Sequence, residues 1–413
     1  MRARAHRSPR ASRALIRAAS AALLAAALPF PSLADDAAPE STLPAFANEV
    51  EASLVRAIMG LRQNGLRHAL GEIDLALAKT PNFRLGYLIK GDLLMARAGN
   101  PVAFGPLTAS ASAGVAPLQD EARARLMHYL DAPPRDYLPL PMMQLAPEQS
   151  HAILVDTARS RLFVFANRKG EPRYVTDFYI SLGKNGVEKR REGDQKTPLG
   201  VYTIVSSKAK AKLPDLYGPG AFPISYPNEW DKQHGRNGHG IWLHGTPSDT
   251  YSRPPRATDG CVALTNDDLQ HLARFVDVGR TPVVISDDIE WVAPDHWMAS
   301  RREFLAAFEQ WRVDWESLDT DRYLSHYSSR FRADGKDLAA WRAHKRKVNA
   351  GKAWVKVSVS DLSAFGNPDG ENMVVVTFAQ DYRSSNLSNR TVKRQYWSRD
   401  QGQWRVVFET VIS

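Results

Sequence analysis

The spacing of apolar residues changes along this chain, and this change limits the fold more than any other feature. From about residue 47 to residue 130 the apolar residues follow helical spacing, whereas from His151 to Ile285 they alternate in short runs typical of β-strands. Helical spacing returns near Ala299 and gives way to further strand runs. Since 413 residues exceed what one core normally holds, the pattern predicts a multidomain α+β protein of successive helical, mainly-β and α+β parts.

The first 34 residues are basic and then apolar, as in a secretory signal peptide. Six arginines precede an apolar run from Ala18 to Leu28, and the small-residue site Ser32-Leu33-Ala34 follows. The apolar run is too short to span a bilayer as a stable helix. We therefore expect residues 1–34 to direct export to the periplasm, where the protein would be peripheral to the membrane at most. An uncleaved anchor or a mitochondrial-type segment is the alternative interpretation.

Composition excludes several classes of protein. A hydrophobic content of 43% with 24% charged residues is that of a globular protein, neither disordered nor membrane-spanning. The net charge of +9 includes the six leader arginines, so the remainder carries about +3 and gives no reason to expect nucleic-acid binding. The single cysteine, Cys261, cannot form an internal disulfide bond in an oxidising compartment. A lone thiol in such a compartment is either buried in the protein or used for its reactivity.

Residues 35–145 are expected to form a helical domain that ends in a Pro-rich linker. Within Asn64 to Asn100, small or helix-ending residues hold the positions that they occupy in a tetratricopeptide-like helical hairpin, namely Ala69, Ala76, Pro81 and Gly91. Only about one and a half repeats fit, fewer than the roughly three that a free-standing array needs. We interpret the hairpin as a cap on its neighbour, with a partner-binding surface as the alternative.

The central part combines strand runs with one long aperiodic segment. The expected strands lie at residues 153–155, 162–165, 174–180, 200–205, 240–244 and 282–285. Residues Ser206 to Gly238 show too little periodicity for regular elements, and we interpret them as a lid or groove wall because long loops are usually functional. The basic run Lys184 to Lys196 is interpreted as solvated surface.

Residues 298–413 begin with a helical stripe of aromatic residues, which we interpret as core: Phe304, Phe308, Trp311 and Trp315. Strands are expected at residues 354–359, 373–379, 391–398 and 404–411, the last two joined by a hairpin at Asp400-Gln401-Gly402. This order resembles the cone-shaped nuclear-transport-factor-two-like fold. Either this domain or the helical one is the candidate surface for a protein partner or a homodimer.

The residues suited to catalysis lie in two short segments. His244 ends the apolar run of Ile241 to Pro247, and Cys261 lies in Thr258 to Leu264, directly after an Asp-Gly pair. Amide cleavage by a thiol needs a thiolate, which a nearby imidazole generates before protonating the leaving amine. We therefore expect Cys261 as a nucleophile of depressed pKa and His244 as its base. The alternative is that both are inert, buried structural residues.

Two neighbours of these residues suggest further roles. Gly260 permits a tight turn that would aim the amide groups near Cys261 at a developing oxyanion. The recurrence of His234, His239 and His244 every five residues raises the alternative of a zinc peptidase. Residues five apart on a strand face opposite sides, however, and no carboxylate stands at ligand spacing. We expect neither a metal nor another cofactor.

The two segments resemble the YkuD-type L,D-transpeptidase family, whose pattern is His-Gly, a spacer, and Ser/Thr-His-Gly-Cys-apolar-Arg. The matching residues are His244, Gly245, Thr258, Gly260, Cys261 and Val262, and the family's upstream Thr-Pro-x-Gly element matches Thr197-Pro198-Leu199-Gly200. Asp259 replaces the family's second His, and Ala263 stands where Arg is common. Arg253 or Arg256 could supply the missing cation.

The resemblance covers about His151 to Asp287 and implies a catalytic domain over residues 148–290 that acts on peptidoglycan stem peptides. It implies that the Gly245 carbonyl orients His244, and that Thr258, Asp259, Arg253 and Arg256 contact the substrate. The implied activity is transpeptidation through a Cys261 thioester.

The order of the parts resembles the cell-shape L,D-carboxypeptidases, which trim tetrapeptides to tripeptides. Trimming of this kind, or hydrolysis that releases a wall-bound protein, is the alternative enzymatic activity. An inactive peptidoglycan-binding scaffold is the alternative from another class.

Overall fold

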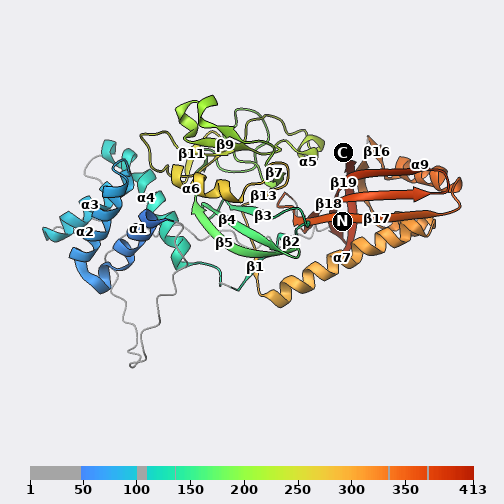
Figure 1. Ribbon diagram of the computed structural model, residues 1–413, viewed down its shortest axis with the longest axis horizontal. Coiled ribbons are helices and arrows are strands. Elements are labelled where there is room, and N and C mark those ends of the chain that lie inside the picture. The colour runs from blue at the N-terminus through green and yellow to red at the C-terminus, as the bar shows by residue number, and fades with distance from the viewer. Residues whose placement is uncertain (1–47, 100–108, 135, 334, 370–371) are drawn as a thin grey trace, which may run out of the picture.

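The computed structural model describes residues 48–99, 109–134, 136–333, 335–369 and 372–413. A helical region, a central β-rich region and a C-terminal α+β region follow one another along the longest axis of the molecule (Figure 1). The expected signal peptide lies outside the described residues and stays a prediction. Within the described ranges, every helix is too short or too polar to cross a bilayer.

The helical region consists of α1 (Glu49–Met59), α2 (Leu61–Lys79), α3 (Arg84–Arg97) and α4 (Ala109–Leu130), as the apolar spacing predicts. Ala69 and Ala76 are fully buried where α2 packs in the helical core. Gly91 has open space around it, so it is not a small residue that lets two helices pack closely, as its position in a tetratricopeptide-like hairpin predicts. Gly86 has that role instead, because a Cβ there would lie 2.9 Å from the Leu77 side chain.

The central region contains a five-stranded sheet in the order β5-β4-β3-β13-β7. These strands are β3 (His151–Asp156), β4 (Arg161–Arg168), β5 (Glu171–Tyr179), β7 (Gly200–Thr203) and β13 (Pro282–Ser286). A smaller sheet runs in the order β12-β10-β9-β8, with β8 (Lys208–Ala209), β9 (Gly220–Pro223), β10 (Trp242–His244) and β12 (Val262–Ala263). β6 (Leu182–Gly183) pairs with β11 (Arg256–Thr258). The expected strands are confirmed, and one apolar core joins the two larger sheets.

The segment 206–238 is more regular than its sequence suggests. Besides β8 and β9, it holds the short helices η1 (Lys210–Lys212), η2 (Asp215–Tyr217) and α5 (Glu229–Gln233). Each of these elements has two to five residues, too few to display a period, and the strands are fixed by pairing with β10 and with each other. The prediction of no regular elements is therefore wrong. Two further short helices, α6 (Asn266–Leu272) and η3 (Ala273–Phe275), precede β13.

The C-terminal region packs helices against a seven-stranded sheet. The helices are α7 (Pro294–Glu316), α8 (Thr320–Ser325) and α9 (Leu338–Ala350). In sheet order the strands are β16 (Lys336–Asp337), β15 (Tyr327–Ala333), β20 (Gln403–Val411), β19 (Ser388–Asp400), β18 (Met373–Ser384), β17 (Val355–Gly366) and β2 (Met142–Gln144). The aromatic stripe of α7 is buried against this sheet, which confirms that it is core. Gln401 and Gly402 both have positive φ in the predicted β19–β20 hairpin turn.

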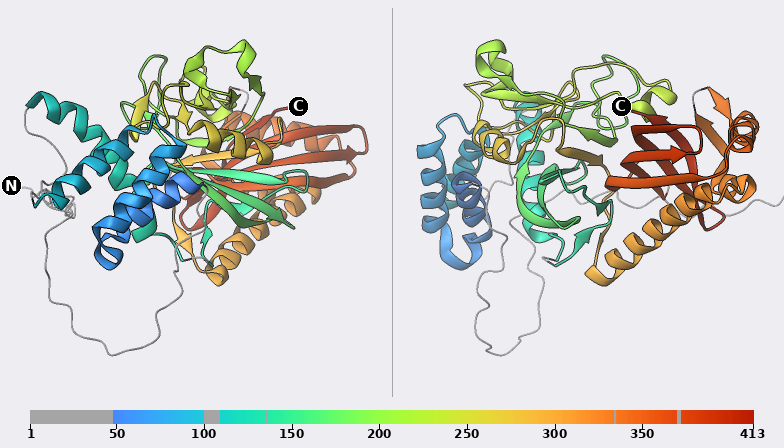
Figure 2. Two further views of the ribbon diagram at one scale, coloured as in Figure 1. Left: turned by 60° about the vertical axis from the view of Figure 1, so that its left-hand side comes forward. Right: turned by 45° about the vertical axis from the view of Figure 1, so that its right-hand side comes forward.

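The Pro-rich segment between the helical and central regions is built into two sheets. β1 (Leu138–Pro139) pairs with β14 (Trp291–Val292), and β2 forms the edge of the C-terminal sheet by pairing with β17. The central and C-terminal regions lie next to each other (Figure 2), and buried side chains from both belong to one apolar cluster. At this interface the Trp230 ring stacks on Tyr396 with centroids 4.7 Å apart.

Candidate active site

The pairing of two short strands brings His244 and Cys261 to one face of the smaller sheet. β10 and β12 are parallel, with Leu243 opposite Val262 and His244 opposite Ala263. Side chains two residues apart on a strand share a face, and Cys261 directly precedes β12. The imidazole and the thiol therefore emerge on the same side, offset by roughly 7 Å along the strands.

Tyr217, at the end of η2, forms a wall beside this face. Its ring contacts His244 edge-on with centroids 5.1 Å apart, and it packs against Trp242 at 4.8 Å. These contacts agree with the strand geometry, because Trp242 and His244 are two residues apart on β10 and their side chains lie on the same face. They also support the interpretation of residues 206–238 as a groove wall. The sequence offered no signal for Tyr217 beyond the length of that segment.

His244 is held in one tautomer. Its Nδ1 lies 2.6 Å from the Gly245 carbonyl oxygen, and because a carbonyl only accepts, Nδ1 carries the proton and Nε2 is left as a base. His244 is 2% exposed, and this burial lowers its pKa to about 4, with a smaller contribution from the positive charge of Arg253. The imidazole is therefore neutral at pH 7. Gly245 is tightly packed, since a Cβ there would lie 2.3 Å from Asn266 Oδ1.

The Cys261 thiol is half-buried and protonated at rest. It donates a hydrogen bond of 3.3 Å to the Gly240 carbonyl. Burial raises its pKa to about 11, although the Trp242 backbone N–H and the charges of Lys189 and Arg253 oppose this rise. The expectation of a depressed thiol pKa is therefore wrong for the resting protein, because the loss of hydration outweighs the nearby cations.

The turn before Cys261 is stabilised by two threonines. Gly260 has a φ of 122° and approaches the backbone so closely that a Cβ would lie 2.6 Å from the Lys196 carbonyl oxygen. The Thr258 hydroxyl donates to the Cys261 carbonyl at 2.7 Å and accepts from the Gly260 N–H at 3.1 Å. The Thr197 hydroxyl donates to the Gly260 carbonyl at 3.0 Å and accepts from the Gly183 N–H at the same distance.

These contacts correct two expectations. Thr258 is 3% exposed and its hydroxyl is used within the turn, so it shapes the backbone rather than facing a substrate. The Gly260 N–H is bonded to Thr258 and so does not point at an oxyanion. Thr197 is a site residue that the sequence reasoning missed, although the Thr-Pro-x-Gly element was the signal that contained it.

The charged candidates occupy different places. Arg253 is half-buried, and its charge acts on both Cys261 and His244. Arg256 is exposed and lines a cavity of about 640 Å³ between α4 and the central region. Asp259 is exposed and accepts hydrogen bonds of 3.0 Å from Lys184 Nζ and Gln195 Nε2. Of the two arginines, Arg253 is thus the one whose charge reaches the site.

The basic run Lys184 to Lys196 is not uniformly solvated. Lys189 is 4% exposed and pairs with Asp194 at 2.7 Å, which corrects the surface interpretation for this residue. Its charge lowers the pKa of the Cys261 thiol. The run is thus a folded loop beside the site.

The recurrent histidines have separate partners. His234 Nδ1 lies 2.8 Å from the Trp230 carbonyl oxygen, whereas His239 is exposed and pairs with Glu192. In the part of the chain that the structure describes, no group of three or more His, Cys, Asp or Glu side chains is arranged to hold a metal ion.

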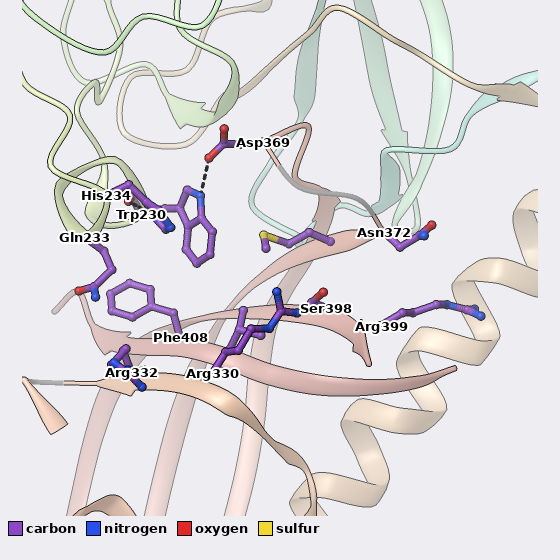
Figure 3. Close-up of a pocket in the computed structure, with 12 residues that line it drawn as sticks. Trp230, Gln233, His234, Arg330, Arg332, Asp369, Asn372, Ser398, Arg399 and Phe408 are labelled. Atoms are coloured by element: carbon purple, nitrogen blue, oxygen red, sulfur yellow. Dashed lines mark hydrogen bonds between the residues drawn. The ribbon is translucent and has the colours of Figure 1, made fainter. Parts of the chain in front are cut away.

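A cavity of about 470 Å³ lies where α5 meets the C-terminal sheet (Figure 3). Arg330 and Arg332 of β15 line it together with the Phe408 ring, and Trp230 donates a hydrogen bond of 2.7 Å to Asp369 at its rim. Neither Cys261 nor His244 lines this cavity. It is therefore a separate, cation-lined space.

Two family models match this chain. Residues 150–285 match the L,D-transpeptidase catalytic domain (YkuD), and residues 303–410 match the Cds6 C-terminal NTF2-like domain. The resemblances inferred from the sequence are thereby confirmed for both regions.

The similarity to curated relatives covers only part of the chain. YafK of Escherichia coli (strain K12), named as a candidate L,D-transpeptidase, is 34% identical over 111 residues, which are 26% of this chain and 40% of YafK. The chain thus spans about 40% of the length of the curated relatives it matches.

The similar solved structures cover a larger share of this chain than YafK does. Bd1075 of Bdellovibrio bacteriovorus is 28% identical with a TM-score of 0.59, covering 67% of this chain and 98% of that one. The helical cell shape determining protein Pgp2 of Campylobacter jejuni (K307A mutant) is 27% identical with a TM-score of 0.58, covering 71% of this chain and 98% of that one.

Proposed function

Because residues 150–285 match the L,D-transpeptidase catalytic domain, we propose that this protein cleaves a peptide bond in peptidoglycan stem peptides through a thioester on Cys261. The supporting observation is the parallel register of β10 and β12, which directs His244 and Cys261 to one face of a sheet. The hydrogen bond from Nδ1 to Gly245 leaves the Nε2 of His244 available as the base.

The proposed first half-reaction uses these groups in order. His244 Nε2 takes the thiol proton as the sulfur attacks the carbonyl carbon of the third stem residue. The Cys261 N–H stabilises the oxyanion, since the Gly260 N–H is already bonded. The intermediate collapses, the C–N bond breaks, and the leaving D-alanine takes the proton from His244. Arg253 binds a carboxylate of the stem peptide.

The proposed second half-reaction is acyl transfer. If an amine of a neighbouring stem attacks the thioester, the product is a crosslink, which is L,D-transpeptidation. If water attacks instead, the product is a trimmed tripeptide, which is L,D-carboxypeptidation. The second outcome is favoured by the similarity to Pgp2, a helical cell shape determining protein, over 71% of this chain.

One digestion tests both proposals. The purified protein is incubated with a disaccharide-tetrapeptide, and the masses of the products are measured by mass spectrometry. Crosslinked dimers are the result expected for transfer, and tripeptide with free D-alanine is the result expected for trimming. Cys261→Ala is expected to form neither, and if it retains either activity the assignment of the nucleophile is wrong.

The inactive-scaffold alternative is tested by the same digestion and not by thiol reactivity. A pKa of about 11 keeps the resting Cys261 thiol protonated, so slow alkylation at neutral pH is expected of an active enzyme too. Absence of any product from wild-type protein would support the scaffold.

The surroundings of the enzyme are part of the proposal. Export to the periplasm by residues 1–34 would bring it to its substrate. The α2–α3 hairpin, proposed to be tetratricopeptide-like, would act mainly as a cap, because Phe83 at its turn packs on Tyr251 of the central region with ring centroids 4.8 Å apart.

A further inference from the structure

We propose that the helical region positions the active-site cation: Glu121 of α4 holds the loop that carries Arg253, so that the positive charge of Arg253 acts on Cys261 and His244. This inference deepens the proposed function and rests on it for the catalytic role of Arg253. Glu121 is a positioning residue, because it acts through the loop and touches neither the thiol nor the imidazole.

The residues just before Arg253 are held by the helical region. Tyr251 is 8% exposed and belongs to the helical core, where its ring packs against Phe83. The Ser252 hydroxyl donates a hydrogen bond of 2.6 Å to Glu121 Oε1. Both contacts cross from the central region to the helices, so the backbone entering Arg253 depends on the helical region.

Arg253 itself and the residues just after it are held by the central region. The Tyr179 hydroxyl donates to the Arg253 carbonyl at 2.9 Å. The Ser181 hydroxyl donates to the Pro254 carbonyl at 2.5 Å, and a backbone amide of β6 donates to the Pro255 carbonyl at 2.8 Å. The loop is therefore fixed on both sides, which limits where the Arg253 side chain can reach.

A buried ion network joins these two attachments. Arg125 donates to Glu121 Oε1 through Nε at 3.1 Å and Nη2 at 3.0 Å, and it also pairs with Glu51. The same guanidinium lies 3.9 Å from the centroid of the Tyr179 ring, whose hydroxyl binds Arg253. Glu51 pairs in turn with Arg161 of β4 at 2.6 Å. Arg125 thus ties the Glu121 attachment to the Tyr179 attachment.

Ala263 stands where the family pattern has Arg, and this arrangement explains how the protein can still place a cation near Cys261. The family pattern carries Arg on the strand after the cysteine, whereas here the cation comes from a loop and needs external support. The charged groups that act on the Cys261 thiol are Asp259, Lys189 and Arg253, with the Tyr217 hydroxyl also near it. The positive charge of Arg253 favours the thiolate, so its displacement raises the thiol pKa.

The single cysteine allows a direct test in the full chain. The rate of Cys261 alkylation by iodoacetamide is measured against pH, independently of any peptidoglycan activity. Arg253→Gln is expected to slow alkylation at pH 8 about threefold, because the thiolate fraction falls while the remaining thiolate becomes more nucleophilic. Ser252→Ala and Tyr179→Phe, which keep the cation but loosen its loop, are expected to shift the rate in the same direction.

Three further variants make the test specific. Ser252→Thr keeps the hydroxyl and is expected to restore the wild-type profile. Ser252→Ala combined with Arg253→Gln is expected to be no slower than Arg253→Gln alone. Ser360→Ala removes a serine–carboxylate bond of 3.0 Å in the C-terminal region and is expected to change nothing.

The outcomes separate this inference from the proposed function. If Arg253→Gln slows alkylation but Ser252→Ala does not, the helical region does not position the cation, whatever the effect of Tyr179→Phe. If Arg253→Gln itself has no effect, the cation does not act on the sulfur, and the inference is again wrong. If wild-type protein makes no product from a muropeptide but the variants change the alkylation rate as expected, the proposed function is wrong. The inference that the helical region positions Arg253 is then still supported.

Discussion

At the residue scale, burial keeps both members of the candidate catalytic pair uncharged. Cys261 has a pKa of about 11 and His244 a pKa of about 4, in both cases mainly because burial disfavours the charged form. A thiolate–imidazolium ion pair is therefore not the resting state. Proton transfer to Nε2 would accompany attack on the substrate, so the base must be neutral before the reaction begins.

The pKa of His244 predicts an unusual acid limit. A general base works in its neutral form, which exists above its pKa, and burial lowers that pKa to about 4. We expect kcat/KM for tetrapeptide cleavage to hold from neutral pH to about pH 5 and to fall as pH approaches 4. Initial rates of D-alanine release across this range would measure it. A midpoint near the ordinary histidine pKa of about 6.5 would contradict the buried, neutral base.

Gly245→Ala tests how the imidazole is held. A Cβ there would lie 2.3 Å from Asn266 Oδ1, so the carbonyl that orients His244 must shift. We expect a loss of about 1–3 kcal/mol in the free energy of unfolding and a fall in kcat greater than any rise in KM. Gly71→Ala, in open space on α2, is the matched control and is expected to be neutral or slightly stabilising. Equal activity of the two variants would argue against a role for this carbonyl.

At the element scale, the length of a helix or strand decided whether it could be predicted from the sequence. Strands such as β3 and β4 and the helical stripe on α7 are long enough to display their period, and each was predicted. η2 and α5 have three and five residues, so no period could reveal them, and Tyr217 was missed with them. The motif predicted the Cys261 turn, but its hydrogen bonds to Thr258 and Thr197 depend on residues brought together by folding.

The turn around Cys261 predicts a role for Thr197. Thr197→Val keeps the shape of a fully buried side chain but removes the hydroxyl that links Gly260 to Gly183. Two buried polar groups lose a partner, so we expect a loss of about 1–3 kcal/mol in stability, measured by urea unfolding, and a lower kcat. Thr410→Val on β20 is the control. Unchanged kcat in Thr197→Val would mean that the turn holds its shape without the hydroxyl.

At the scale of the whole molecule, the order of the regions was predictable and their contacts were not. The helical, mainly-β and α+β order follows from local spacing of apolar residues. The pairing of β2 with β17 joins Met142 to Phe365, and the contact of Glu51 with Arg161 joins residues 110 positions apart. Such contacts leave no local pattern, which is why the Pro-rich segment was expected to be a linker.

The buried ion network predicts a large difference between two arginines of α4. Arg125→Ala would leave Glu51 and Glu121 buried without their shared partner, so we expect a loss of about 3–5 kcal/mol in the free energy of unfolding. Arg123, exposed and paired with Asp120 at 3.2 Å, is the control, and Arg123→Ala is expected to cost less than about 1 kcal/mol. Urea unfolding measures both. Similar losses would mean that the network does not stabilise the joint between the regions.

The central claim is that the acyl group passes through the Cys261 sulfur. The most direct measurement is the intact mass of the protein after brief incubation with disaccharide-tetrapeptide and acid quenching. We predict a new species heavier by the mass of the substrate minus D-alanine, absent in Cys261→Ala and mapped to the Cys261 peptide. Product formation at full rate by Cys261→Ala, or an adduct on another residue, would contradict the account.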